Sequence, residues 1–330
     1  MTARDLATLP KAHLHLHMEG GMRPETLTDL AAAARIAVPA IRGYGSFPAF
    51  AATYLAACEV LRSESDWRRL VRETVEDAAA AGAVWVEPAT YLPHHRLRLG
   101  PDDALLAAAI DEAGSAGRDH GVGVGFIVAA DRTLAPTDAV QQAELALRFA
   151  GEGVVGFGLA NDEALEGAKS ERFAEAFAMA RAGGLLACPH AGELAGPKNV
   201  WGALDALEAD RIQHGVRAVE DPDLVKRLAD SGVCLDVCPT SNLMLSVVPS
   251  LADHPLPQLL EAGVRCSVIG DEPLLFGRGL LEEYELCRSE LGFSDAQLAH
   301  VARCSIESSG ASAELKRRAV EGIDSWLATG

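Results

Sequence analysis

The feature that most constrains the fold is an alternation of short apolar runs with longer helical stretches. Helical stretches such as 170–184 and 221–232 separate the runs, and the second suits an N-cap at Asp221 and an end at Gly232. This alternation predicts a parallel sheet closed into an α/β barrel, (β/α)8, with the longest gap, 18–82, supplying extra helices over the barrel mouth. The eight apolar runs are 12–17, 83–90, 122–130, 154–160, 184–190, 211–215, 233–239 and 264–270.

Composition narrows the kind of protein. The chain has 330 residues, 49% of them hydrophobic, and no Gly/Ser/Pro-rich linker, so we expect one domain over 1–330. A formal charge of −18 disfavours binding to nucleic acid or anionic membranes. The N-terminus lacks the apolar core of a secretory signal, and no apolar run is long enough to span a bilayer, which favours a cytoplasmic protein. Seven cysteines without a CxxC pair predict buried, reduced thiols. The oligomeric state is not encoded in these patterns.

The segment "HLHLH" at 13–17 places three histidines on the first predicted strand. Side chains alternate along a strand, so His13, His15 and His17 are predicted to share the inward face, with Leu14 and Leu16 toward the helices. His17 lies nearest the C-terminal end, where barrel enzymes build their active sites. One such histidine is typical of a hydrogen-bonded core, whereas three on one face favour metal binding.

Other predicted strands also end in polar residues. The fifth ends at His190 with Glu193 shortly after, the sixth at His214, and the eighth runs into Asp271 and Glu272. The fourth ends in Asn161, Asp162 and Glu163. A single acidic residue after a strand is often only a helix N-cap. Because successive strand ends converge at a barrel mouth, the conjunction indicates one site.

The combined donor set predicts a metal-assisted hydrolase acting on a small molecule. Three imidazole nitrogens and one carboxylate suit Zn²⁺ with a position left open for water. A bound divalent ion lowers the pKa of that water. Glu193 is placed to shuttle a proton, and His214 to polarise or deprotonate the water. The four candidate ligands are His15, His17, His190 and Asp271.

Several segments together resemble the adenosine deaminase family of the amidohydrolase superfamily. The resemblance extends over 9–276 and is carried by "LPKAHLHLHMEGGMRPETL", "VVGFGLANDE", "HAGE", "RIQHGVRAVEDP", "VCPTSN" and "SVIGDEPLLF". It implies a (β/α)8 barrel that holds one zinc ion through the same four ligands. It also implies a hydrolytic attack at C6 of an adenine nucleoside with release of ammonia.

The resemblance further implies individual roles. Glu193 would carry a proton to purine N1, and His214 would orient or deprotonate the attacking water. Glu19 would face the ribose 5′ side, and Phe47 and Phe50 would be apolar lid residues, although simple helix packing explains those two equally well. His13 is given no ligand role. The cytidine and tRNA deaminase signature H-x-E…P-C-x-x-C is absent from the sequence.

Three positions depart from the pattern of the resembled family. The usual pair of aspartates is Asp271–Glu272 here, and Asn161 and Gln213 stand where glycines are usual. The second acid is expected to contact purine N7, so Glu272, like Asn161, is a candidate substrate-binding residue. The departures leave two alternatives open. They are either tolerated variants in a plain adenosine deaminase or signs of a different amino-heterocycle.

One subgroup is closest in appearance. The segments "YGSFPAF", "WVEPATYLP" and "ADRTLAPTDAV" resemble bacterial deaminases of 6-aminodeoxyfutalosine, an intermediate of menaquinone biosynthesis that carries a carboxylate on the 5′ side. Arg96 and Arg98 could meet that carboxylate, although each alone is typical of a solvated loop charge. A catalytically inactive family member is the least favoured alternative, because every ligand and both proton-transfer residues are present.

Overall fold

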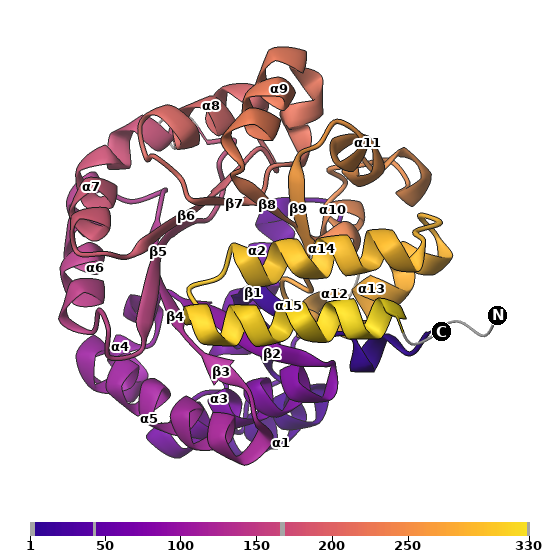
Figure 1. The fold of residues 1–330 in the computed structure, drawn as a ribbon. Helices are drawn as coiled ribbons and strands as arrows, with labels where there is room; N and C mark the ends of the chain where they lie inside the picture. The colour runs from indigo at the N-terminus through magenta and orange to yellow at the C-terminus, as the bar shows by residue number, and fades with distance from the viewer. Residues whose placement is uncertain (1–3, 42–43, 166–168, 329–330) are drawn as a thin grey trace.

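The computed structural model describes residues 4–41, 44–165 and 169–328. Its strands are all parallel and are hydrogen-bonded in the order β1-β2-β4-β5-β6-β7-β8-β9, with β3 on the edge of β2 (Figure 1). The bridge between Leu16 and Asp271 and the hydrogen bond from His17 N to Asp271 O, 3.1 Å, bring the last strand against the first. The predicted (β/α)8 barrel is thereby confirmed. The strands are β1 Lys11–His17, β2 Ala83–Thr90, β3 Gly123–Val124, β4 Phe126–Asp131, β5 Val154–Ala160, β6 Leu186–Ala191, β7 Arg211–His214, β8 Cys234–Val237 and β9 Arg265–Val268.

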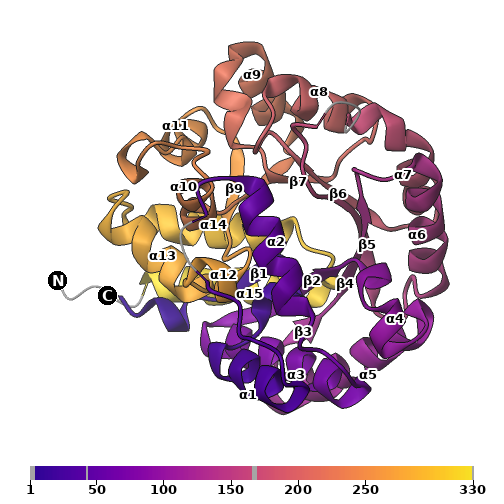
Figure 2. The same ribbon diagram turned by 180° about the vertical axis from the view of Figure 1, so that it is seen from behind.

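The helices surround the sheet and cover both of its ends. Figures 1 and 2 show α2 across one face of the barrel and α14 with α15 across the other. The helices are α1 Pro24–Ala34, α2 Phe47–Cys58, α3 Glu64–Ala80, α4 Arg96–Leu99, α5 Asp102–His120, α6 Pro136–Arg148, α7 Ala174–Ala182, α8 Pro197–Asp205, α9 Pro222–Ser231, α10 Pro239–Met244, α11 Leu256–Glu261, α12 Pro273–Phe276, α13 Leu280–Ser289, α14 Asp295–Glu307 and α15 Ala313–Ala328.

Most predicted elements are present, and local chemistry explains the differences. The carboxylate of Asp221 accepts from two backbone N–H groups at the start of α9, and Gly232 ends the helix with a φ of 73°. The third predicted strand is divided into β3 and β4. The eighth stops at Val268, two residues short of its predicted end. The predicted helix 170–184 opens with a short 3₁₀ turn before α7 and ends earlier, at Ala182.

The first strand departs from simple alternation. Its register shifts between His13 and Leu16, and both residues line a second cavity between β1, α3 and α13. His13 Nε2 there accepts the Gly270 N–H at 3.3 Å. The prediction that all three histidines point into one site is therefore wrong for His13, because the irregular register sends it to a different cavity.

Two other expectations concern the chain as a whole. All seven cysteines are free and buried, as predicted. Among the described residues, no helix is both long and apolar enough to cross a membrane. The single-domain interpretation of 1–330 stays a prediction.

Candidate metal-dependent active site

A cavity of about 270 Å³ opens at the C-terminal ends of the strands. Strand-end residues form its floor and α2 forms part of its roof, so the extra helix from the gap 18–82 covers the barrel mouth as predicted (Figure 2). The lining side chains include His17, Phe47, Phe50, Tyr54, Tyr91, His94, Asp131, Asn161, His190, Glu193, His214, Asp271 and Glu272.

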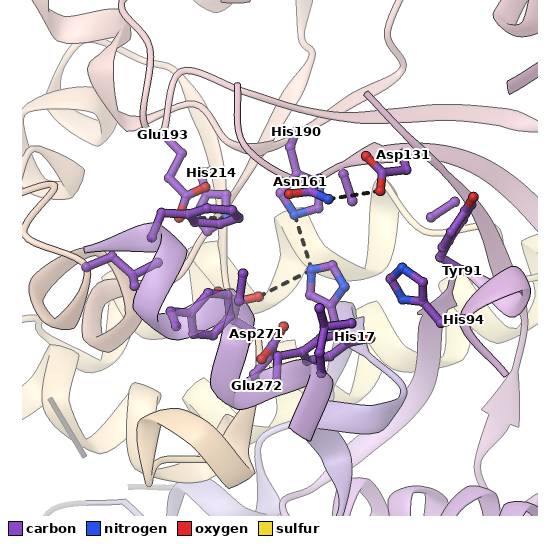
Figure 3. A pocket seen from close by; sticks show the side chains of 18 of the residues that line it. His17, Tyr91, His94, Asp131, Asn161, His190, Glu193, His214, Asp271 and Glu272 are labelled. Atoms are coloured by element: carbon purple, nitrogen blue, oxygen red, sulfur yellow. Dashed lines mark hydrogen bonds and ion pairs between the residues drawn. The ribbon is translucent and has the colours of Figure 1, made fainter. Parts of the chain in front are cut away.

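The four predicted metal ligands meet on one side of this cavity. His190 Nε2 lies 3.0 Å from His15 Nε2 and 3.2 Å from His17 Nε2. Asp271 Oδ1 lies 3.3 Å from His15 Nε2 and 3.7 Å from His17 Nε2. Figure 3 shows His17, His190 and Asp271 directed at one another. Strands at opposite ends of the sequence therefore bring three nitrogens and an oxygen around one point.

The hydrogen bonds of these rings fit a bound cation. His190 Nδ1 lies 3.0 Å from the Leu159 carbonyl, and His15 Nδ1 lies 3.5 Å from Cys238 Sγ. A carbonyl only accepts, so His190 Nδ1 carries the proton and His190 Nε2 presents a lone pair. Burial lowers the pKa of both rings well below the usual value, which keeps them neutral. Ring nitrogens that face one another beside a carboxylate are the donor set of a divalent zinc-type site.

The backbone is strained where the site is built. Asn161, His214 and Asp271 have φ values of 81°, 64° and 57°. The left-handed region is costly for residues with a Cβ and persists where the surrounding structure enforces it. All three residues line the cavity, so this strain belongs to the site.

Glu193 and His214 face each other beside the ligand set. His214 Nε2 lies 3.6 Å from Glu193 Oε1, and both side chains are buried. Burial, followed by the charges of Asp271 and Glu163, raises the pKa of Glu193 well above its usual value. Burial lowers the pKa of His214. The site therefore combines a carboxyl group that can hold a proton with a neutral imidazole.

The loop carrying Glu193 is held by a pair of residues to which the sequence assigned no role. Glu163 accepts the backbone N–H groups of Gly192 at 3.0 Å and Glu193 at 2.5 Å. The buried guanidinium of Arg132 lies 3.8 Å from Glu163 and donates to the His190 carbonyl. The polar strand end at 161–163 was visible in the sequence, but its contact with the neighbouring loop depends on the tertiary structure.

The three departures occupy different places. Glu272 and Asn161 line the cavity, whereas Gln213 is buried outside it. The Asn161 side chain donates a hydrogen bond of 2.9 Å to Asp131, and Asp131 also lines the cavity (Figure 3). Glu272 Oε2 has no hydrogen-bond partner within the described part of the chain. Burial and the charge of Asp271 raise the pKa of Glu272 well above its usual value.

The residues predicted to form the lid line the cavity, whereas the residue predicted on the ribose 5′ side does not. Phe47 and Phe50 line the cavity from α2, with ring centroids 5.5 Å apart. Glu19 is not among the lining residues. It is buried behind the wall, 2.6 Å from His95 Nε2, and accepts from the Tyr54 hydroxyl at 2.8 Å. Tyr54 itself reaches the cavity.

The two arginines considered for a carboxylate are engaged elsewhere. Arg96 forms a two-pronged pair with Asp102, at 2.5 and 3.0 Å, and Arg98 pairs with Glu59 at 2.5 Å. Neither lines the cavity.

Comparison with known proteins identifies the family. Residues 10–326 match the adenosine deaminase family. The chain belongs to the adenosine deaminase family. A protein of Streptomyces coelicolor named putative adenosine/adenine deaminase is 46% identical, with 98% of each chain covered. The family assignment makes the chain a hydrolase acting on carbon–nitrogen bonds of cyclic amidines.

Solved structures from this group have the same fold. The adenine deaminase of Arthrobacter aurescens superposes with a TM-score of 0.90 at 31% identity, covering 97% of this chain and 99% of that one. An amidohydrolase of Burkholderia ambifaria, solved with bound Zn, gives a TM-score of 0.89 at 27% identity, covering 98% and 93%.

Proposed function

We propose that this protein is a zinc-dependent deaminase that replaces the 6-amino group of adenosine or adenine by oxygen and releases ammonia. The observation that carries the proposal is the convergence of His15, His17, His190 and Asp271 beside Glu193 and His214 in one cavity. Relatives named adenosine/adenine deaminase and adenine deaminase support an adenine-type substrate.

The residues divide the chemistry between them. Zinc held by the four ligands would act as a Lewis acid and lower the pKa of a coordinated water. Glu193, whose pKa is raised by burial, holds a proton that it can deliver to ring nitrogen N1 as the water oxygen adds to C6. His214 lies beside Glu193 and would orient the attacking oxygen. The proton given up by the water reaches the amino group, the C6–N bond breaks and ammonia leaves, and the ring keeps the new C6–O bond.

The charge of the cavity bears on the choice of substrate. Its described lining includes Asp131, Glu193, Asp271 and Glu272 but no lysine or arginine. Away from the metal ligands, a carboxylate or phosphate would find no lysine or arginine side chain to pair with. This favours an uncharged base or nucleoside over 6-aminodeoxyfutalosine, the substrate that would place the enzyme in menaquinone biosynthesis.

A second candidate keeps the hydrolase and changes the ring. The unpartnered Glu272 Oε2 and the amide of Asn161 give the cavity polar groups at positions where the resembled family differs. They could recognise another amino-heterocycle by hydrogen bonding.

The test is ammonia release by zinc-loaded protein offered adenine, adenosine, 2′-deoxyadenosine and 6-aminodeoxyfutalosine in parallel. We expect turnover of adenine or adenosine. In Glu193→Gln we expect kcat to fall about 10²–10⁴-fold, the usual contribution of a general acid–base group. Exposed Glu152→Gln is the control and should change nothing. No ammonia release from any of the four compounds would favour the second candidate. Full activity of Glu193→Gln would contradict both candidate functions.

A further inference from the structure

A chain of buried hydrogen bonds leads from a backbone amide to His214. The Leu256 N–H donates to His254 Nδ1 at 3.1 Å. His254 Nε2 lies 3.2 Å from Asn242 Oδ1, and Asn242 Nδ2 lies 3.2 Å from His214 Nδ1. Asn242 and His254 are 0% and 4% exposed, so water does not compete for these contacts.

The backbone amide fixes the direction of every bond in this chain. An amide N–H can only donate, so His254 Nδ1 accepts and the proton of that neutral ring is on Nε2. His254 therefore donates to Asn242, which orients the amide with its oxygen toward His254 and its nitrogen toward His214. The Asn242 amide group then donates to His214 Nδ1, which leaves the His214 proton on Nε2.

We infer that Asn242 and His254 are positioning residues that hold His214 as the Nε2–H tautomer, so that it presents a hydrogen-bond donor to the active site. The inference rests on the proposed function only for its catalytic consequence. His214 Nε2, the atom that would carry the proton, is the ring nitrogen that lies toward Glu193, 3.6 Å from Oε1. Burial lowers the pKa of His254 to about 4, which keeps that ring neutral as the argument requires.

The arrangement is opposite to that of the predicted zinc ligand His190. His190 donates from Nδ1 to the Leu159 carbonyl and turns a bare Nε2 inward. His214 accepts at Nδ1 from Asn242 and turns an N–H inward. One cavity thus holds two kinds of imidazole, distinguished by what lies behind each ring.

The consequence concerns the role of His214 in the reaction. Its only basic lone pair is already engaged by Asn242, so it can orient an attacking oxygen by donating a hydrogen bond to it. It cannot accept a proton at Nε2 without first losing the one it carries. Of the two roles expected for His214, orientation is therefore favoured over deprotonation.

The direct test is NMR of the zinc-loaded enzyme with ¹⁵N-labelled histidine. We expect protonated-type shifts at Nε2 and bare-type shifts at Nδ1 for both His214 and His254. The same measurement should show the reverse for His190, with Nδ1 protonated. A protonated Nδ1 on His214 would overturn the inference. No turnover is needed, so a failure of the proposed deaminase activity would leave this result unaffected.

Two substitutions of Asn242 separate tautomer control from packing. Asn242→Asp keeps the shape but replaces the donor by an acceptor, whereas Asn242→Ala removes the group. If the relay sets the tautomer, Asn242→Asp should lower kcat more than Asn242→Ala, by roughly 100-fold or more, because a wrong imidazole tautomer is severely damaging in hydrolysis. A packing role predicts the opposite order and would refute the relay. Zinc content and Tm are measured for both.

His254 provides a second pair of variants if Asn242→Asp does not fold. His254→Gln can still donate to Asn242 Oδ1, whereas His254→Phe cannot. We expect kcat to stay within about 3-fold in the first and to fall about 10-fold in the second, with KM and zinc content little changed, as a lost orienting hydrogen bond predicts. Equal activities of the two variants would contradict a relay through His254.

Discussion

Two buried polar clusters in the same barrel differ in how their charges are satisfied. The first consists of Arg211, Glu87 and Asp236 and is called the lower cluster. Arg211 pairs there with Glu87 and with Asp236, each at 2.6 Å. Ser267 donates to Asp236 at 2.7 Å, and the Gly310 N–H donates to Glu87 at 2.5 Å. In the second, the ligand cluster of His15, His17, His190 and Asp271, His190 Nε2 lies 3.0 Å from His15 Nε2 and 3.2 Å from His17 Nε2.

The difference distinguishes a structural cluster from a functional one. The lower cluster contains a cation of its own, and protein donors complete it. The ligand cluster gathers acceptors with no cation among them, and buried acceptors are unfavourable without a positive partner. Burial of polar side chains alone would not separate the two, but the balance of donors and acceptors does. It follows that the ligand cluster has the donor set of a metal site, whereas the charges of the lower cluster are satisfied within the protein.

The largest expected effect is the loss of the metal. His190→Ala removes the nitrogen closest to both other ring donors, so zinc per chain should fall from near one to near zero and deamination should become undetectable. Chelation of the wild-type protein should do the same and lower its Tm, because a ligand bound only by the folded state stabilises it. Metal analysis and thermal unfolding measure both effects.

His13→Ala is the matched control for that experiment. His13 lies on the same strand but in a different cavity, so this variant should keep its zinc. An equal loss of zinc in both variants would show that the ligand assignment is wrong.

The next effect concerns the lower cluster and should appear in stability. Arg211→Met leaves two buried carboxylates without their cation, which should lower the free energy of unfolding by about 3–5 kcal/mol. Adding Glu87→Gln and Asp236→Asn should recover part of that loss, because the uncompensated charges are gone. Urea unfolding measures the stability, and zinc content should stay near one per chain. A zinc loss as large as that of His190→Ala would mean that the clusters are not independent.

The sequence predicted the ligand cluster better than its surroundings. Histidines and acids at strand ends converge by the geometry of any such barrel, so His190 and Asp271 could be assigned from position alone. The sequence assigned no role to Glu87, which belongs to the lower cluster. His13 was misplaced because a register shift is not visible in an alternating pattern. The Asn242–His254 relay joins segments whose contact depends on loop packing, which the pattern does not encode.

Glu19 represents an intermediate case, a buried acid with protein partners beside the cavity. Burial alone would raise its pKa, but hydrogen bonds from His95 and Tyr54 outweigh this and lower the pKa from 4.5 to about 2. Because the folded pKa is the lower one, the stabilisation is present above pH 4.5 and is lost as the pH falls toward 2. A pKa lowered from 4.5 to about 2 corresponds to about 3 kcal/mol of stability, of which about 1 kcal/mol should be lost by pH 4.

Comparing the wild type with Glu19→Gln isolates the contribution of Glu19 to stability. The other acids titrate in both proteins, so their effects cancel in the difference. Urea unfolding between pH 7 and pH 4 should show a steeper loss of stability in the wild type. Parallel curves would mean that Glu19 is not ionised in the folded protein. It would then resemble the ligand cluster more than the lower cluster.

The smallest effect is expected at Glu272, the acid for which neither cluster supplies a partner. Its side chain passes close to Gly20, where a Cβ would lie 2.5 Å from Glu272 Cγ, so the glycine leaves room for the longer acid. Glu272→Asp withdraws the carboxyl group by one methylene, and we expect KM to rise about 5–10-fold with a smaller change in kcat, the cost of one weakened hydrogen bond of about 1 kcal/mol. Gly20→Ala should displace the same side chain and raise KM similarly. An unchanged KM in both variants would mean that Glu272 does not contact the substrate.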